Sequence, residues 1–190
     1  MGKHKFDIRH IDILNDPKRL EILDLNTVCS HFHLQKDMTL IDIGTGTGLF
    51  AEAFLKLLPE ACCYALDIRH EAIDWIRNSR ETYKTGRLIP LLMDEAKTSL
   101  EDNIADFLFM ITLHHELEEP VELMKECRRI LKPDGKLLIA DWTKDATDGP
   151  PRQHRIEPSM AISHLETAGF KDIAMFDASK SLFCIGATNL

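Results

Sequence analysis

The residues best suited to chemistry follow the ends of predicted strands. His115 and Glu116 come shortly after an apolar run at 104–112. Histidine is the side chain best suited to proton transfer near neutral pH, so this pair is a candidate base or a pair that positions an acceptor. Alternatively, His115 caps the next helix or only lines a pocket, because many enzymes act by alignment alone. Adjacent side chains diverge, so His114 and His115 with Glu116 do not predict a metal site.

A second group of residues forms a glycine-rich turn. An aliphatic run at 39–43 ends at Gly44, Gly46 and Gly48, and a helical pattern follows. This order is typical of a nucleotide-binding βαβ unit, in which glycines allow a tight turn and a close approach of the ligand to the backbone. Free N–H groups at the helix start can bind a polar or anionic group. The shifted frame Gly46-x-Gly48-x-x-Ala51 also fits a dinucleotide motif, and a simple turn without a ligand is the third alternative.

Three acidic residues at strand ends narrow the choice of ligand. Asp42 precedes the first glycine by two residues, where it would repel a pyrophosphate and suit an ammonium group. Asp67 ends the second predicted strand, where a carboxylate can accept hydrogen bonds from both ribose hydroxyls, in NAD as in other adenosine ligands. Asp94 ends the third strand, where it can bond an adenine amino group or cap a helix at 96–100. Together the three acids predict an adenosine ligand.

Alternating strands and helices must position these residues. Parallel strands are predicted at 39–43, 61–68, 87–93, 104–112 and 136–142. Helices are predicted at 49–58, 70–83, 96–100, 117–131 and 158–168, and two more through Leu20 and through Val28. Strands at 173–176 and 181–187 are joined by few residues and form an antiparallel hairpin. This alternation predicts a doubly wound α/β sheet, whose ligands bind beyond the carboxyl ends of the strands.

Composition and charge exclude several classes of function. The chain has 190 residues, which suits one domain with a sizeable core. Its net charge of −8 argues against a nucleic acid as the main partner. No apolar run approaches the roughly 18 residues that span a bilayer. The first residues lack the apolar core of a signal peptide. The cysteines form no C-x-x-C pair. We expect a cytoplasmic monomer or homodimer.

Four ordered segments resemble class I S-adenosylmethionine (SAM)-dependent methyltransferases. They are LIDIGTGTG at 40–48, ALDI at 65–68, ADFLF at 105–109 and RILKPDGKL at 129–137. The similarity covers about residues 36–187 and is greatest to the small-molecule branch that includes ubiquinone, menaquinone and arsenite methyltransferases. The resemblance implies a Rossmann-like, seven-stranded sheet in the order 3-2-1-4-5-7-6, mostly parallel. It also implies a SAM-dependent domain at 36–190, a helical N-terminal lid at 1–35, a small-molecule acceptor, and SAM as cofactor, whose ammonium group suits Asp42.

The resemblance also implies residues that hold the cofactor. They are Asp42, Gly44, Thr45 and Gly46 for the methionine part, Asp67 for the ribose, Ile68, Met93 and Asp94 for the adenine, and Met110 and Ile111 near the sulfonium. Methyl transfer from a sulfonium needs alignment and exclusion of water, and sometimes removal of a proton. His115 and Glu116 are the candidates for that last task, and no metal is expected.

Four further residues are candidates for closing the site over the acceptor. They are Phe6 and His10 near the N-terminus, and His154 and Arg155 in the loop after the strand at 136–142. A flexible terminus and a solvated loop are the alternative. Arsenite methyltransferases place cysteines around the acceptor, whereas Cys62 and Cys63 belong to the second strand, so arsenite is not the expected substrate.

Two other functions stay open. A NAD-type oxidoreductase would use the same glycines and Asp67, although Asp42 and the terminal hairpin disfavour it. A SAM-binding regulator or subunit without catalytic activity would keep every cofactor residue. Binding of SAM rather than NAD separates the first alternative from a methyltransferase, and turnover of an acceptor separates the second.

Overall fold

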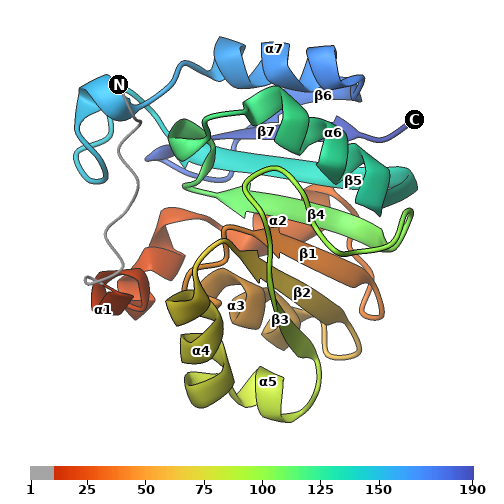
Figure 1. Ribbon diagram of the computed structural model, residues 1–190. Helices are drawn as coiled ribbons and strands as arrows, with labels where there is room; N and C mark the ends of the chain where they lie inside the picture. The colour runs from red at the N-terminus through yellow and green to blue at the C-terminus, as the bar shows by residue number, and fades with distance from the viewer. Residues whose placement is uncertain (1–10) are drawn as a thin grey trace.

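A seven-stranded sheet forms the centre of the molecule. The computed structural model describes residues 11–190, so the predicted lid residues Phe6 and His10 lie outside the described part of the chain. The strands follow the order β3-β2-β1-β4-β5-β7-β6 (Figure 1). They are β1 (Thr39–Ile43), β2 (Cys62–Asp67), β3 (Leu88–Leu92), β4 (Ala105–Ile111), β5 (Leu131–Trp142), β6 (Lys171–Phe176) and β7 (Leu182–Thr188).

The pairing of the strands is mostly parallel. β3, β2, β1, β4 and β5 pair in parallel with their neighbours, and β7 runs antiparallel to both β5 and β6. The predicted fold is therefore confirmed, including the strand order and the C-terminal hairpin. Parallel strands place their carboxyl ends at the same edge, so the residues after β1, β2, β4 and β5 converge there.

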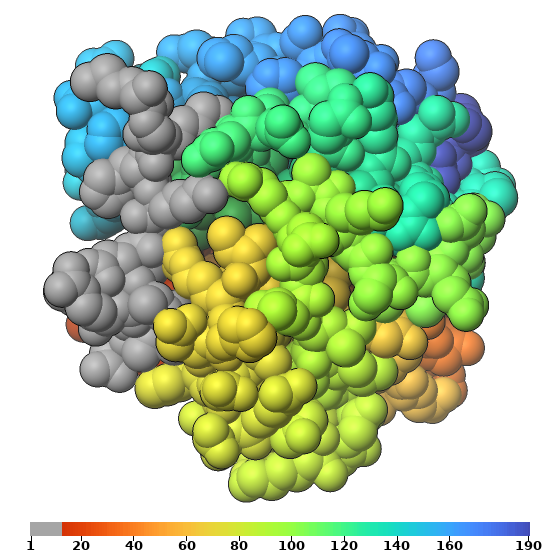
Figure 2. Space-filling model, in the orientation of Figure 1, coloured from red at the N-terminus to blue at the C-terminus, as the bar shows by residue number. Residues whose placement is uncertain are grey.

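Helices cover both faces of the sheet. Apolar side chains of α2, α3 and α4 share one core with the sheet, and those of α6 and α7 share a second core on the opposite face. The helices are α1 (Ile11–Leu14), α2 (Leu25–His31), α3 (Leu49–Leu57), α4 (His70–Ser79), α5 (Glu81–Lys84), α6 (Pro120–Ile130) and α7 (Pro158–Ala168), with short 3₁₀ helices η2 (Pro17–Ile22), η3 (His114–Glu116) and η4 (Arg152–His154). Figure 2 shows α4 in yellow beside residues 94–103 in green, with α7 in blue along the upper margin. Within residues 11–190, no helix is long and apolar enough to cross a membrane.

The central strand β4 is apolar because both of its faces are covered. Phe107 and Phe109 point to the side of α3, where the ring of Phe109 lies 4.7 Å from that of Phe54. Leu108 and Met110 point to the opposite side and pack in the core with α6 and α7. This alternation follows from the two-residue repeat of a strand and fixes which side chains of β4 can reach a ligand.

The segment before β1 contributes to the same core as the sheet. Asp24 accepts hydrogen bonds from the backbone of Asn26 and Thr27 at 3.0 and 3.2 Å and so begins α2. Val28 is fully buried, and the ring of Phe32 lies 5.0 Å from that of Phe107. Packing against β4 therefore holds this segment beside the edge of the sheet where ligands are expected.

Several predicted helix boundaries differ from those observed. The helix predicted at 96–100 is wrong, because this stretch forms a turn closed by a bridge between Asp94 and Lys97. The helix predicted at 70–83 is split into α4 and α5 by Arg80, whose backbone is extended (φ −96°, ψ 124°). The helix predicted at 117–131 begins later, at Pro120, a residue that suits the first turn.

Two other predicted elements also differ from the observed structure. The helix expected through Leu20 is the 3₁₀ helix η2, capped by Asp16. β5 begins earlier than predicted, because Leu131 pairs with Ala105. Residues 132–135 form an irregularity within β5, where the pairing with β4 shifts.

A buried carboxylate explains why residues 94–103 do not form a helix. Glu126 of α6 accepts hydrogen bonds from the backbone N–H and the hydroxyl of Thr98, at 2.8 and 2.7 Å. Arg129 donates two more, from Nε at 2.9 Å and from Nη2 at 2.6 Å. Burial disfavours the charged form, but the bonds from Arg129 and Thr98 outweigh it and hold the pKa of Glu126 at about 2. The segment is therefore tied to α6 through side chains.

We expect Glu126→Gln to lower the free energy of unfolding by about 1–3 kcal/mol at pH 7, because it weakens charge-assisted hydrogen bonds in a buried site. The pKa of Glu126 is below its ordinary value of 4.5, so its stabilisation is complete above about pH 4.5 and is lost as the pH falls toward 2. Urea unfolding at pH 7 and pH 3 measures both effects.

Glu122→Gln is the matched control for this prediction. Glu122 lies one turn earlier on α6 in an exposed pair with Lys125, so its replacement costs less than about 0.5 kcal/mol. Equal losses in the two variants, or a loss for Glu126→Gln that does not shrink toward pH 3, would contradict the role of the buried network.

Candidate functional site

The turn after β1 requires glycine. Gly44, Gly46 and Gly48 all have positive φ angles, of 69°, 54° and 71°. A Cβ atom on Gly44 would lie 2.7 Å from the side chain of Leu113. The backbone N–H groups of Gly44 and Thr45 both donate to the carbonyl of Leu66 in β2, at 2.8 and 3.0 Å. The turn is thus held tightly against the ends of β1 and β2, and α3 begins directly after it.

Two carboxyl groups lie beneath this turn. Asp42 of β1 is 4% exposed and accepts a hydrogen bond from the hydroxyl of Thr45 at 2.7 Å. Burial raises the pKa of Asp42 to about 8; the bond from Thr45 and the positive charge of Arg19 oppose this rise, and the charge of Asp67 adds to it. Such a carboxyl group is ready to ionise when a cation enters beside it.

Asp67 is the second carboxyl group, at the end of β2. The backbone N–H groups of Gly46 and Arg69 donate to its two oxygens, at 2.9 and 3.0 Å. Burial raises its pKa, although these hydrogen bonds act in the opposite direction. Asp67 therefore connects the glycine turn to the residues that follow β2.

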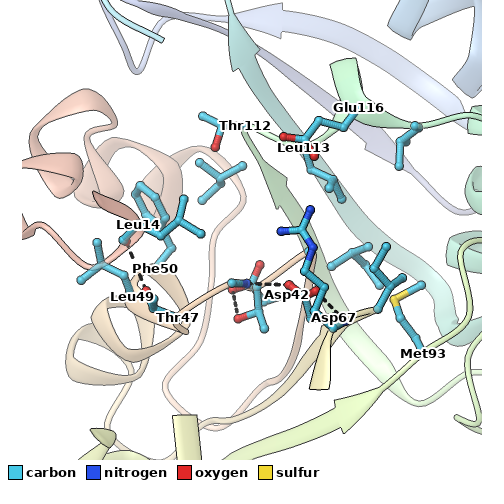
Figure 3. A pocket seen from close by; sticks show the side chains of 18 of the residues that line it. Leu14, Asp42, Thr47, Leu49, Phe50, Asp67, Met93, Thr112, Leu113 and Glu116 are labelled. Carbon is cyan, nitrogen blue, oxygen red and sulfur yellow. Dashed lines mark hydrogen bonds between the residues drawn. The ribbon is translucent and has the colours of Figure 1, made fainter. Parts of the chain in front are cut away.

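A cavity opens above the two carboxyl groups (Figure 3). Thr112, Leu113 and Glu116 lie opposite Asp42 and Asp67, while Leu14, Leu49 and Phe50 form one side and Met93 the other. The predicted residues that line it are Asp42, Gly44, Thr45, Gly46, Asp67, Ile68, Met93 and Ile111. The cavity combines two carboxyl groups at one side with apolar walls.

Two of the predicted cofactor residues do not line this cavity. Asp94 is exposed in the turn that follows β3, and its neighbour Glu95 lines the cavity instead. Met110 is fully buried in the core against α6, because the alternation of β4 turns it away from the side of Ile111. The residues beyond Ile111, which turn toward the cavity, could not be placed from the strand pattern.

Residues before β1 complete the wall of this cavity. Arg19 donates from Nη2 to the hydroxyl of Thr112 at 2.9 Å and from Nη1 to the carbonyl of Leu14 at 3.3 Å. Its guanidinium carbon lies 5.8 Å from the centre of the Phe50 ring. The hydroxyl of Thr47 also donates to the carbonyl of Leu14, at 3.2 Å. Sequence reasoning missed Arg19, because no pattern in the short helix η2 connects it to the glycine turn.

A buried arginine joins this N-terminal segment to the glycine turn. Arg80 donates from Nε to the carbonyl of Thr47 at 2.7 Å, from Nη1 to Glu52 at 3.1 Å and from Nη2 to Asn15 at 2.6 Å. Glu52 belongs to α3 and forms an ion pair with Arg80. The reach of this side chain explains the break between α4 and α5, and it fixes three segments against one another.

Thr112 lies between the end of β4, β5 and the N-terminal segment, and it has a rare backbone conformation. It follows β4 with a φ of 56°, which a β-branched residue seldom adopts. Its backbone N–H donates to the carbonyl of Ala140 at 2.7 Å, and its hydroxyl accepts the bond from Arg19. Neighbouring elements therefore hold it in place.

A second cavity adjoins the first. The two share Leu14, Arg19, Thr112 and Glu116. The second cavity is also lined by His115, by Trp142 at the end of β5, and by the loops at 148–151 and 177–181. Its remaining wall is formed by the N-terminal segment, including most of η2, and by Ala53, Lys56 and Leu57 of α3. The two cavities thus share one common wall.

His115 is oriented by a carboxylate that the sequence interpretation did not identify. Its Nδ1 lies 2.8 Å from Oδ1 of Asp141, and its backbone N–H donates to Oδ2 at 2.9 Å. A carboxylate accepts, so Asp141 favours the form of His115 with hydrogen on Nδ1 and a basic Nε2. Nε2 lies 3.8 Å from Glu116. An acid at the end of the strand predicted at 136–142 was a signal that could have found Asp141.

His154 and Arg155, which were predicted to close the site over the acceptor, lie in the loop after β5 and away from the walls of the two cavities. Arg155 is buried, and it donates to the carbonyls of Thr143, Ala146, Asp148 and Pro150 at 2.7–2.9 Å. It therefore holds the loop that follows β5 in shape. In the described chain, neither Arg155 nor His154 is among the residues that line the two cavities.

The other candidates for metal or thiol chemistry lie apart from the cavities. Nε2 of His114 lies 3.1 Å from Nδ1 of His164 on α7, so His114 turns away from its neighbour His115. Over residues 11–190, no group of three or more His, Cys, Asp or Glu is arranged to hold a metal ion. Cys63, Cys127 and Cys184 are buried free thiols.

The chemistry of the first cavity fits SAM better than a dinucleotide. The buried carboxyl group of Asp42 suits an ammonium group, and the carboxyl group of Asp67 suits a ribose diol. The apolar side chains of Ile68 and Met93 suit a purine ring. A pyrophosphate gives neither carboxyl group a cationic partner, and its negative charge opposes the ionisation of both.

Comparisons with known proteins agree with this fit. A family model described as "Methyltransferase domain" matches residues 41–139. The crystal structure of a SAM dependent methyltransferase from Aquifex aeolicus is 32% identical, with a TM-score of 0.89, and the match covers 98% of this chain and 100% of that chain.

Curated relatives are more distant and longer. The demethylmenaquinone methyltransferase of Chlamydia muridarum is 27% identical over 58% of this chain and 47% of its own length. The malonyl-[acyl-carrier protein] O-methyltransferase of Methylococcus capsulatus is 30% identical over 54% of this chain and 37% of its own length. The chain thus spans less than half the length of these relatives. From the domain match, the fold and the chemistry of the cavity, the chain belongs to the SAM-dependent methyltransferase family.

Proposed function

We propose that the protein methylates a small-molecule acceptor bound in the second cavity, and that His115 receives the proton that the acceptor loses. The observation that carries this proposal is the wall shared by the two cavities, with His115 lining the second. In this proposal the predicted lid at 1–35 supplies Leu14 and Arg19 to the shared wall.

The proposed orientation of the cofactor follows from the first cavity. Asp42 and the glycine turn hold the methionine part, and Asp67 holds the ribose. The adenine lies against Ile68 and Met93, with Glu95 rather than Asp94 at that end. This orientation directs the methyl group toward Thr112 and the second cavity, away from the buried Met110.

SAM supplies a methyl group on a positively charged sulfur. The nucleophilic atom of the acceptor bonds to the methyl carbon as the carbon–sulfur bond breaks, and S-adenosylhomocysteine is left. A proton released from the acceptor goes to Nε2 of His115, and Asp141 stabilises the resulting imidazolium. The enclosing walls align the acceptor and exclude water, which supplies much of the acceleration.

A SAM-binding subunit without catalytic activity is the second candidate function. It would need the first cavity but not an oriented histidine in the second. The buried hydrogen bond between His115 and Asp141 favours the catalytic alternative, because it keeps the imidazole in the tautomer whose Nε2 can accept a proton. Formation of S-adenosylhomocysteine with any acceptor from a panel of phenols, amines and carbon acids distinguishes the two.

With an acceptor that loses a proton, we expect His115→Asn to lower kcat by about 10²–10⁴-fold, because it removes the base. Asp141→Asn lowers kcat by less, since the histidine stays but loses its orientation. SAM affinity, measured by calorimetry, stays within about twofold in both variants, because neither residue lines the first cavity. His33→Asn, at an exposed position outside both cavities, is the control and keeps wild-type kcat. Full activity of His115→Asn would show that alignment alone is sufficient.

We expect SAM affinity to rise with pH between 5.5 and 7. Asp42 is protonated in the free protein, since its pKa is about 8, whereas its proposed ionic bond to the ammonium group needs the carboxylate. Binding therefore releases a proton, and affinity increases by up to about tenfold per pH unit in this window. Calorimetry in buffers of different ionisation enthalpy counts the released proton.

Asp42→Asn and 5′-methylthioadenosine are the two controls for this expectation. The variant has no proton to release at this position, and the ligand lacks the ammonium group. Both should show a much flatter dependence on pH. The same slope for SAM in wild type and Asp42→Asn would exclude Asp42 as the partner of the ammonium group.

A further inference from the structure

We infer that Trp142 selects the acceptor by donating its indole N–H to an oxygen atom of that molecule. The acceptor is then an apolar compound that carries a carbonyl, ether or hydroxyl oxygen. This inference rests on the proposed function, which places the acceptor in the second cavity, and it adds the class of compound that this cavity takes.

An unbonded donor at the cavity wall is the first support. Trp142 is the last residue of β5, is 9% exposed and lines the second cavity. Its backbone N–H donates to Asp141, but its indole N–H has no hydrogen-bond partner in the described chain. The indole nitrogen of Trp75 is enclosed by protein, whereas that of Trp142 is not. The small exposed part of Trp142 therefore includes its N–H group.

The surroundings of this donor are apolar. Trp142 shares a core with Leu23, Leu25 and Ala178, and all three also line the second cavity. The indole N–H only donates, so it can bond an oxygen atom but not an ammonium group. A donor without a partner in such surroundings costs free energy, which an oxygen atom of a ligand would recover. This part of the wall therefore fits an apolar compound with an accepting oxygen.

Neighbouring hydroxyl groups of the cavity wall are already bonded. The hydroxyl of Ser179 donates to the carbonyl of Ile22 at 2.5 Å and accepts from two backbone N–H groups of its own turn. The hydroxyl of Thr112 accepts from Arg19. The indole N–H of Trp142 is thus better placed than these hydroxyl groups to bond a ligand.

The loop after β5 fixes the ring of Trp142 before any ligand binds. Gly149 lies against the ring, since a Cβ atom on it would be 2.5 Å from an indole carbon. Arg155 donates to the carbonyls of Asp148 and Pro150, on either side of Gly149, at 2.8 Å each. The indole therefore needs little reorganisation to meet a ligand, which favours affinity.

One carboxylate oxygen joins Trp142 to the proposed base. Oδ1 of Asp141 lies 2.8 Å from Nδ1 of His115 and accepts from the backbone N–H of Trp142 at 2.7 Å. His115 lines the same cavity. A compound bonded to the indole N–H is therefore held in a fixed position relative to the base, which aligns it for methyl transfer.

The ligands 1-indanone and indane provide a test, because they share one ring skeleton and differ in a carbonyl oxygen. We would measure Kd values of both by NMR titration of the full chain saturated with S-adenosylhomocysteine. Trp142→Phe should weaken 1-indanone about 5–10-fold more than indane, because one hydrogen bond is lost and the smaller ring affects both ligands alike. Trp75→Phe is the matched control outside both cavities and should change neither Kd value.

The indole signals give a second readout that needs no change at Trp142. The chain has two tryptophans, so two indole N–H signals are expected in a ¹H–¹⁵N spectrum, and Trp75→Phe assigns them. In wild type, 1-indanone should shift the indole proton of Trp142 downfield and indane should not. This readout keeps the test valid if Trp142→Phe unfolds.

Equal weakening of both ligands by Trp142→Phe would show that the ring only packs in the cavity and would overturn the inference. A Trp142 signal that 1-indanone does not shift downfield, with or without binding elsewhere, would overturn it as well. S-adenosylhomocysteine cannot transfer a methyl group, so neither result depends on turnover. A failure of the proposed function would appear separately, as no S-adenosylhomocysteine formed from SAM with the acceptor panel.

Discussion

The structure depends on a carboxyl group buried at the end of a central strand. Asp42 lies under a turn of glycines, with β2 on one side and β4 on the other. Burial without a cation is costly for the ionised group, so the carboxyl group stays protonated near neutral pH. The bond from Thr45 partly compensates, and Arg19 brings a positive charge near. In the proposed function, the ammonium group of the ligand would lie beside Asp42 and offset this cost.

Much of the fold could be predicted from local patterns in the sequence. Apolar runs of strand length, separated by amphipathic helical stretches, lead to the parallel sheet, and the short link between the last two strands leads to the hairpin. Asp42 and Asp67, which both line the first cavity, were singled out because Asp42 precedes the first glycine by two residues and Asp67 ends the second strand. Strand alternation and glycine turns depend on residues that are close in the sequence, so they can be predicted from a single sequence.

The parts that could not be predicted depend on contacts between distant residues. The stretch expected as a helix at 96–100 is instead bound through Thr98 to Glu126 on α6. This turn leaves Asp94 exposed and brings Glu95 to the cavity, a difference of one residue that no propensity encodes. Arg19 reaches Thr112 across 93 positions of the chain, and a contact of that kind has no signature in a local window.

Thr112 illustrates a compromise between stability and precise positioning. A branched residue in the left-handed region costs about 1–3 kcal/mol, and glycine would adopt the same backbone angle without that cost. The chain instead keeps a hydroxyl group there, which Arg19 uses as its anchor between the two cavities. A stability-driven redesign would replace this residue early, and it would thereby loosen Arg19, the arginine that lines both cavities in the described part of the chain.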